Sequence, residues 1–239
     1  MRKILFVIAM IFCAVNLSAM NPVAPVFKYF SSLLDETRAE LLVGELMSKE
    51  FLANVSNNVK VELSPSLTKQ MKKLSLNSGR KNLNYEVYVI NSDIPDEIPF
   101  PGGILFITKG LLSHAKTSEQ LDFILARNIM HMVLKNPMRL VKRVGIYPVL
   151  LNQLKLPEEK REKHKILIAL RDYLGNTGKL EHISADEQAL ALTDDPEKTR
   201  KAAIDMISQF SVSVWPVMPL ETVDIPDRIN KLKELNLTR

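Results

Sequence analysis

Apolar positions recur at helical spacing on the N-terminal side of the chain. Residues 28–55 show this pattern most clearly, which predicts one long helix. Pro65 begins a second, shorter helical segment, SLTKQMKKLSL, because proline is favoured in the first turn of a helix. Together these two segments predict an N-terminal helical region over residues 20–83.

The pattern changes to alternation at residues 84–92, NYEVYVINS. Tyr85, Val87 and Val89 would share one face, which predicts a strand with at least one well-buried face. The next segment, SDIPDEIPFPGG, is rich in proline and glycine, so we expect a shaped loop. A second short strand, ILFITKG, follows, and we expect it to pair with the first strand as a hairpin or meander.

A helix that is apolar on nearly all sides is predicted after Thr117. Thr117 and Gln120 have the spacing of a capping box, in which each side chain bonds the backbone of the other residue. One apolar stripe of this helix comprises Leu121, Ile124, Leu125, Ile129 and Met132. Apolar residues also fill most of the other faces, which is typical of a buried helix. We expect Pro137 to end it.

The remainder of the chain is predicted to be mostly helical. Residues 138–155, 180–193 and 197–210 carry helical patterns, and Asp194-Asp195-Pro196 would cap the last of them. Residues 214–226 are expected to be irregular, and residues 226–236 to form a closing amphipathic helix. Helices before and after a small group of strands indicate an α+β fold dominated by helices.

The first 19 residues have the features of an export signal. Arg2 and Lys3 precede an apolar run over residues 4–15, and small residues then permit cleavage after Ala19. The run is shorter than the roughly 20 residues of a membrane span. We therefore expect a signal peptide over residues 1–19 and a location in the periplasm or cell envelope, with an uncleaved membrane anchor as the alternative.

Charge and cysteine content narrow the possible partners. The formal charge of +5 would fall to +3 when Arg2 and Lys3 are removed, and no basic stripe interleaved with aromatic residues is present. We therefore expect no nucleic-acid partner. Cys13, the single cysteine, would leave with the signal, so a mature chain would have neither a disulfide nor a cysteine nucleophile.

Four segments resemble one enzyme family in order and spacing. They are YEVYVINSDIPDEIPFPGGILFITKGLL, TSEQLDFILARNIMHMVLKN, EHISADEQALAL and DIPDRINKLKEL. Together they cover roughly residues 84–235 and are similar to the HExxH zinc metallopeptidases typified by HtpX, BepA and the CAAX prenyl protease. The resemblance implies a metallopeptidase-like domain over residues 84–239, of zincin-like fold, in which a small β-sheet packs on the active-site helix.

The resemblance also assigns positions to the zinc site. In the family, two histidines one helical turn apart bind zinc, a glutamate between them activates water, and a later helix supplies a third ligand. Carried onto this chain, the first histidine position is Arg127 and the glutamate position is Asn128. The second histidine is kept as His131. The third ligand position, four residues before the retained Asp186, is His182.

These replacements predict the loss of hydrolysis. The cation of Arg127 would repel a metal dication, and Asn128 cannot accept a proton from water. His131 and His182 remain as vestigial candidates for weak metal binding. Hence we expect no cofactor, and zinc only if the protein is active. His131 could instead be an ordinary core histidine, and Arg127 could extend its guanidinium into solvent.

The loop between the two predicted strands also departs from the family. Pro101-Gly102-Gly103 match it, but Asp96-Glu97 stand where the family has Asn-Ala. All five residues are expected to border the substrate groove.

New acidic residues near a new cation suggest that one compensates the other. A buried charge without a partner is costly. We therefore expect Arg127 to occupy the place of the metal and to pair with Asp186, Glu181 or Glu97.

Three functions remain open on the sequence alone. The first is an exported, inactive pseudopeptidase whose groove binds unfolded or extended polypeptide, or an envelope protein. The second is an active zinc metalloendopeptidase with altered ligands, drawn from His131, His182 and one of Asp186 or Glu181. The third is a structural helical protein of the envelope. A membrane contact is expected only through an uncleaved N-terminal segment.

Overall fold

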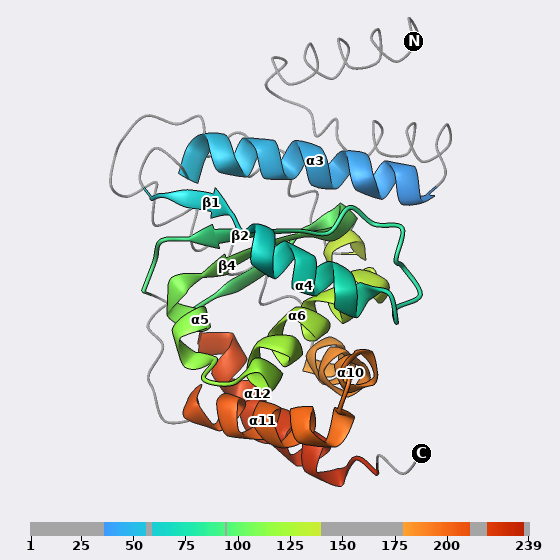
Figure 1. The fold of residues 1–239 in the computed structure, drawn as a ribbon, viewed down its shortest axis with the longest axis vertical. Coiled ribbons are helices and arrows are strands. Elements are labelled where there is room, and N and C mark those ends of the chain that lie inside the picture. Colours follow the sequence, from blue (N-terminus) through green and yellow to red (C-terminus); the bar gives the residue numbers. More distant parts are fainter. Residues whose placement is uncertain (1–35, 56–58, 94, 140–178, 211–218, 237–239) are drawn as a thin grey trace, which may run out of the picture.

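The computed structural model describes residues 36–55, 59–93, 95–139, 179–210 and 219–236 (Figure 1). The predicted signal peptide, the first part of the predicted helix 28–55 and nearly all of residues 138–178 lie outside these ranges. The described residues form helices and one small sheet, which confirms the predicted α+β class.

The two predicted N-terminal helices are present. Helix α3 spans Glu36–Val55, and helix α4 spans Pro65–Ser75. Pro65 occupies the first turn of α4, and the Ser64 hydroxyl accepts a hydrogen bond from the backbone N–H of Leu67. This side chain satisfies one of the backbone donors that a helix start leaves without a partner, so the position of the helix start follows from the local sequence.

The sheet has four strands in the order β1-β2-β4-β3. Their bounds are Val61–Leu63 (β1), Glu86–Ile90 (β2), Glu97–Pro99 (β3) and Ile104–Thr108 (β4). Strand β2 pairs with β4 in parallel, whereas β1 with β2 and β3 with β4 are antiparallel pairs. The predicted hairpin or meander of β2 and β4 was therefore wrong, and the segment expected to be only a loop contains an edge strand.

The turn between β3 and β4 explains this topology. The 3-10 turn η1 (Pro101–Gly103) contains two glycines with positive φ, 79° at Gly102 and 102° at Gly103. Glycine adopts such angles without steric cost, so the chain can reverse there. The strand that enters the turn, β3, becomes the antiparallel neighbour of β4, and β2 takes the other side.

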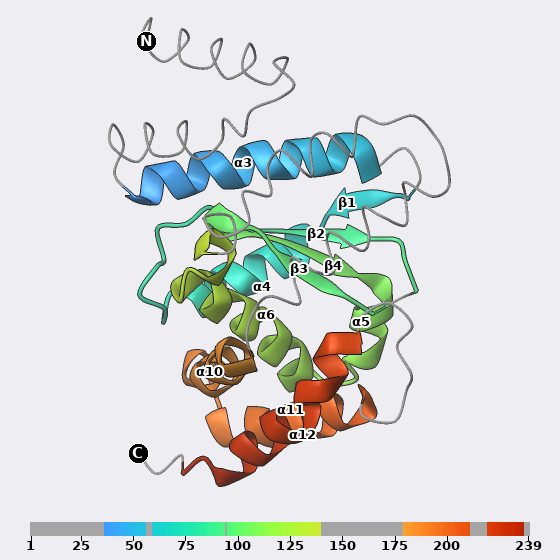
Figure 2. The same ribbon diagram turned by 180° about the vertical axis from the view of Figure 1, so that it is seen from behind.

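Helix α3 crosses one face of the sheet, while α4 and α6 cover the other (Figures 1 and 2). Successive residues of β4 point to opposite faces, so Phe106 packs beneath α3 and Ile107 packs toward α6. All five residues of β4 are buried for this reason.

Helix α6 (Ser118–Val133) follows the short helix α5 (Lys109–His114) in the chain and lies between the sheet and the C-terminal helices (Figure 1). The predicted capping box of Thr117 and Gln120 is present. The prediction that Pro137 ends the helix was wrong. The chain leaves α6 at Val133, turns at Lys135 with φ of 58°, and is helical again over residues 136–139, where Pro137 fits the first turn.

Three further helices pack beyond α6: α10 (Lys179–Ala189), α11 (Pro196–Phe210) and α12 (Pro219–Glu234) (Figure 2). The 3-10 turn η2 (Leu190–Leu192) follows α10, and Asp195 caps α11 through the N–H of Lys198. Helix α12 begins at Pro219 and contains Pro226, so residues 219–225 are helical rather than irregular. With partners on both sides, α6 is buried nearly all round, as its pattern predicts.

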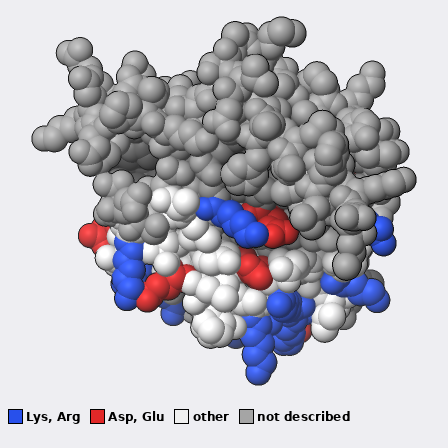
Figure 3. Space-filling model, turned by 90° about the horizontal axis from the view of Figure 1, so that it is seen from above, with Lys and Arg blue, Asp and Glu red and all other residues white. Residues whose placement is uncertain are grey.

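The described part of the surface carries mixed charge. On the face shown in Figure 3, basic and acidic side chains lie beside one another. Among the described residues, no helix has both the length and the apolar character needed to cross a membrane.

The contact between α3 and the glycine turn gives a test of the packing. A Cβ atom on Gly44 would overlap the carbonyl oxygen of Pro101, whereas one on Gly79 would meet no atom within 4 Å. We predict that Gly44→Ala lowers the free energy of unfolding by about 3 kcal/mol because backbone atoms cannot move aside as a side chain can. Gly79→Ala should stay within about 1 kcal/mol of the wild type. Urea denaturation would measure both, and equal values would contradict the described packing of α3.

Candidate functional site

The site forms where α6, α10, α12 and β3 meet. Arg127 and His131 lie one turn apart on α6, and His182 and Asp186 lie one turn apart on the facing helix α10. These four side chains are at most 9% exposed. The fold therefore brings together residues 55 positions apart in the sequence, as the predicted site requires.

Arg127 is buried and surrounded by acceptors. One terminal nitrogen, Nη1, pairs with the carboxylate of Glu97, and the other, Nη2, lies 2.9 Å from Nδ1 of His182. Its Nε lies 3.0 Å from Oδ1 of Asp186, which is ion-pair distance without the alignment of a hydrogen bond. The expected pairing with Asp186 and Glu97 is present, and the alternative in which Arg127 extends into solvent is excluded.

Asp186 is shared by two arginines. Its Oδ2 accepts a hydrogen bond of 2.6 Å from Nε of Arg228, and its Oδ1 accepts one of 3.1 Å from Nη2 of the same residue. Arg228 lies on α12 and is only 6% exposed. Sequence reasoning assigned no role to Arg228, although the Arg-Ile pair of the closing segment marks its position.

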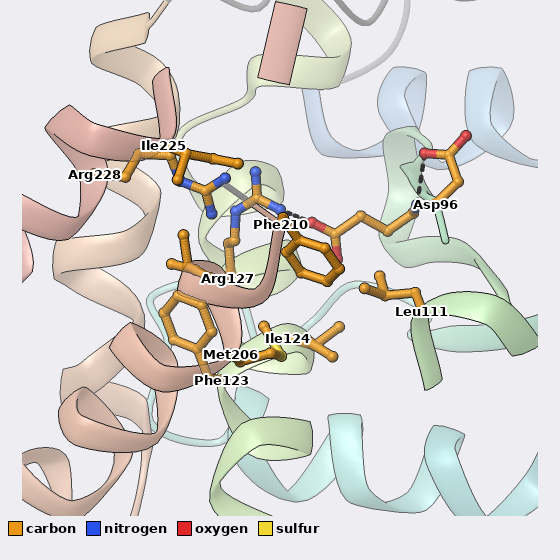
Figure 4. A pocket seen from close by; sticks show the side chains of 11 residues that line it. Asp96, Leu111, Phe123, Ile124, Arg127, Met206, Phe210, Ile225 and Arg228 are labelled. Atoms are coloured by element: carbon orange, nitrogen blue, oxygen red, sulfur yellow. Dashed lines mark hydrogen bonds and ion pairs between the residues drawn. The ribbon is translucent and has the colours of Figure 1, made fainter. Parts of the chain in front are cut away.

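Two acidic residues that were predicted to lie near Arg127, Glu181 and Asp96, bond to other groups. Glu181 faces outward and pairs with Arg139, 3.2 Å away, rather than with Arg127. The carboxylate of Asp96 accepts a hydrogen bond from the backbone N–H of Glu97 at 2.8 Å and points away from Arg127 (Figure 4). Within the described ranges, the partners of these two carboxylates are therefore other groups than Arg127.

The two histidines form an edge-to-face pair. Their ring centroids are 5.3 Å apart and the rings are inclined by 79°. Nδ1 of His131 lies 2.9 Å from the side-chain amide nitrogen of Asn136, a residue that the sequence pattern did not single out. Because an arginine can only donate, Nδ1 of His182 must accept from Arg127, which requires a neutral imidazole.

Burial and nearby arginines keep both histidines neutral. Desolvation by burial, followed by the charges of Arg127 and Arg228, lowers the pKa of His182 to about 3. Burial and the charge of Arg127 also hold the pKa of His131 well below its ordinary value of 6.5. Neither ring therefore carries charge near neutral pH.

Asn128 takes part in the same cluster as a donor. It is fully buried, and its amide nitrogen donates to Glu97 at 2.6 Å and to the carbonyl of Ile124 at 2.9 Å. A glutamate at this position would instead place a second carboxylate against Glu97. No donor among the described residues reaches the Oδ1 atom of Asn128. The arrangement thus suits an amide at position 128 and disfavours a carboxylate.

The residues of the cluster do not fit a zinc ion. No group of three histidine, cysteine or acidic side chains within the described ranges is arranged to hold a metal. Arg127 takes up the acceptor atoms of His182, Glu97 and Asp186 that would face such an ion. The predicted ligands His131 and His182 lie together, but a cation of the protein itself already occupies their surroundings.

A small pocket of about 40 Å³, partly open to solvent, lies beside this cluster (Figure 4). Its polar lining consists of Asp96, Glu97, Arg127 and Arg228. Its apolar lining consists of Leu111, Phe123, Ile124, Met206, Ile207, Phe210 and Ile225. Of the predicted groove loop, only Asp96 and Glu97 border the pocket. The Pro101–Gly103 turn is buried against α3 instead.

Strand β3 lies beside the pocket and is an edge strand of the sheet that the described residues form. In the antiparallel pair of β3 and β4, Asp96 and Phe100 bond to β4, so the backbone groups of Glu97 and Pro99 point away from β4. Pro99 has no N–H, and the N–H of Glu97 is bound by the side chain of Asp96. This edge therefore offers carbonyl acceptors but no donor from either residue.

Comparison with known families gives one match. The family model described as peptidase family M48 matches residues 62–236. No curated protein matches the chain. The matched range contains the four segments identified in the sequence and extends the likeness to β1 and α4.

The neutral histidines predict how stability depends on pH. A histidine with a folded-state pKa below its unfolded value of about 6.5 binds a proton more readily in the unfolded chain, so stability falls as pH drops below 6.5. Each histidine should cost about 2 kcal/mol by pH 5. We predict that the free energy of unfolding falls by about 4 kcal/mol between pH 7 and pH 5.

His182→Asn isolates one of the two contributions, because the asparagine oxygen can replace Nδ1 as acceptor without titrating. Its pH-dependent loss should be about half that of the wild type. Urea denaturation at both pH values provides the measurement, and the same substitution at His114, outside the cluster, is the control. An unchanged loss in His182→Asn would contradict the neutral state of His182.

Proposed function

The chain belongs to peptidase family M48, and on that premise we propose that it is an exported, catalytically inactive member that binds polypeptide. The family is normally zinc-dependent, so loss of the metal site entails loss of hydrolysis. The observation that carries the proposal is the guanidinium of Arg127 among the acceptors that would surround a metal.

Charge balance supports replacement of the metal rather than simple decay of the site. In the family pattern, the charges of a zinc dication and two glutamates, at positions 128 and 182, sum to zero. Both glutamate positions are neutral here, and the gained charges are one cation, Arg127, and one anion, Glu97. The new set also sums to zero, as a buried centre requires.

Loss of the general base supports the same conclusion. Asn128 cannot take a proton from water, and it donates to Glu97. Glu97 does not replace it, because its carboxylate is engaged by Arg127 and Asn128.

Binding of polypeptide is supported by the pocket. Its lining is mostly apolar and partly open to solvent, so it offers a shallow apolar surface to a side chain of a bound polypeptide. Strand addition along β3 would be weak, because Glu97 and Pro99 present acceptors only. We therefore propose that apolar side chains of an unfolded or extended polypeptide enter the pocket, while its N–H groups bond to the carbonyls of β3.

Export to the periplasm or cell envelope is part of the proposal. It rests on the charged start, the apolar run and the small residues before position 20.

Metal content and hydrolysis test the loss of catalysis. We predict that the purified wild type holds less than 0.1 zinc per chain and does not cleave unfolded casein, because Arg127 excludes the ion. Arg127→His with Asn128→Glu should bind about one zinc per chain through His131 and His182. Elemental analysis after dialysis against a chelator-free buffer would measure the zinc content of the wild type and of the double variant.

Adding His131→Ala to that double variant is the matched control, and it should remove the gained zinc. Stoichiometric zinc in the wild type, with cleavage of casein that a chelator stops, would show an active enzyme and end the proposal.

Polypeptide binding is tested with a carboxymethylated, permanently unfolded polypeptide carrying a fluorescent label. We predict that Phe210→Asp weakens binding at least about tenfold, because a buried charge would replace the apolar wall of the pocket. Pro99→Ala should strengthen binding by adding an N–H to the open edge of β3. Fluorescence anisotropy gives the dissociation constants.

Leu76→Asp provides the control, since Leu76 is an exposed apolar residue outside the pocket. Equal binding by all three variants and the wild type would exclude the pocket as the binding site.

A further inference from the structure

We propose that Glu97, Asp186 and His182 form a guanidinium-binding cage, and that Arg127 serves as a permanently attached cation within it. The cage binds a planar monovalent cation and not a metal ion. This inference deepens the proposed function and rests on it, because it states what holds the centre together in the absence of zinc.

Each nitrogen of the Arg127 guanidinium lies beside a different side chain of the cage. Nη1 contacts Glu97 on β3, Nη2 contacts Nδ1 of His182 and Nε contacts Oδ1 of Asp186, both on α10. A guanidinium group presents its donors in one plane at fixed angles, whereas an ammonium ion or a metal does not. The acceptors therefore surround the group on three sides and complement its charge.

The net charge of the cage residues is balanced by one additional positive charge. Glu97 and Asp186 contribute two negative charges, and Arg228 already provides one positive charge through its two hydrogen bonds to Asp186. His182 is neutral and acts as an acceptor. Counted over the described residues, one further monovalent cation makes the centre neutral, whereas a dication would leave an excess positive charge beside Arg228 in a buried site.

Asp186 joins the two arginines of the centre. Its carboxylate is fixed by the 2.6 and 3.1 Å hydrogen bonds to Arg228, and its Oδ1 also lies 3.0 Å from Nε of Arg127. The cage is thus built around two guanidinium groups that share one carboxylate.

Removal of the attached cation tests the cage. Arg127→Ala should lower Tm by roughly 10 °C, because it leaves buried acceptors without their cation. Addition of about 10 mM guanidinium chloride should then raise Tm by several degrees, since a free guanidinium can enter the vacated cage. Equal concentrations of sodium chloride or ammonium chloride should not.

Arg139→Ala is the matched control. Arg139 is half exposed and pairs with Glu181 outside the cage, so guanidinium should not raise the Tm of that variant. Rescue of Arg127→Ala that ammonium reproduces, or no rescue by any cation, would overturn the proposal. So would tight binding of one zinc ion to Arg127→Ala that stabilises it more than guanidinium does.

If Arg127→Ala fails to fold, a double-mutant cycle tests the proposal in place of the rescue by guanidinium chloride. Arg127→Met should destabilise the protein strongly because it leaves Glu97 buried and without its cation. Arg127→Met with Glu97→Gln should recover at least half of the lost Tm. Additive losses would overturn the proposal.

The two proposals fail in different experiments. Zinc-dependent hydrolysis by the wild type would refute the proposed function. The behaviour of Arg127→Ala, with or without guanidinium, decides only the nature of the cage.

Discussion

A buried arginine among buried acids is the interaction on which this centre depends. Arg127 lies in the middle of an apolar helix at 6% exposure, where an uncompensated charge would be costly. Glu97 from the sheet and Asp186 from α10 compensate it. Because these partners come from different elements, the ion pairs also fix how α6 lies against β3 and α10.

This constraint accounts for the neighbouring residues. An amide at Asn128 donates to Glu97, where a carboxylate would repel it. Neutral histidines at positions 131 and 182 avoid adding positive charge beside Arg127 and Arg228, and burial keeps them neutral. The chain belongs to peptidase family M48, and within this framework the residues of the cluster are mutually consistent in charge and hydrogen bonding.

The fold was predictable where local chemistry decides it. The capping box at Thr117, the proline at the start of α4 and the all-round apolar character of α6 each specify an element from neighbouring residues. The pairing of β2 with β4 was not predictable in the same way. Alternating apolar residues show that a segment is a strand, but not which neighbour it has, and here a three-residue strand ending at Pro99 determines that choice.

The sequence by itself predicted the important positions through its resemblance to the family motifs. By that resemblance, Arg127 and Asn128 stand where histidine and glutamate are expected, and His182 and Asp186 have the matching spacing. Only the tertiary structure decided the partners of Arg127. Glu97, Asp96 and Glu181 are equally acidic in sequence, yet Asp96 caps its own strand and Glu181 faces Arg139. Arg228 joined the cluster because α12 packs beside α10, a contact between distant segments that local spacing does not encode.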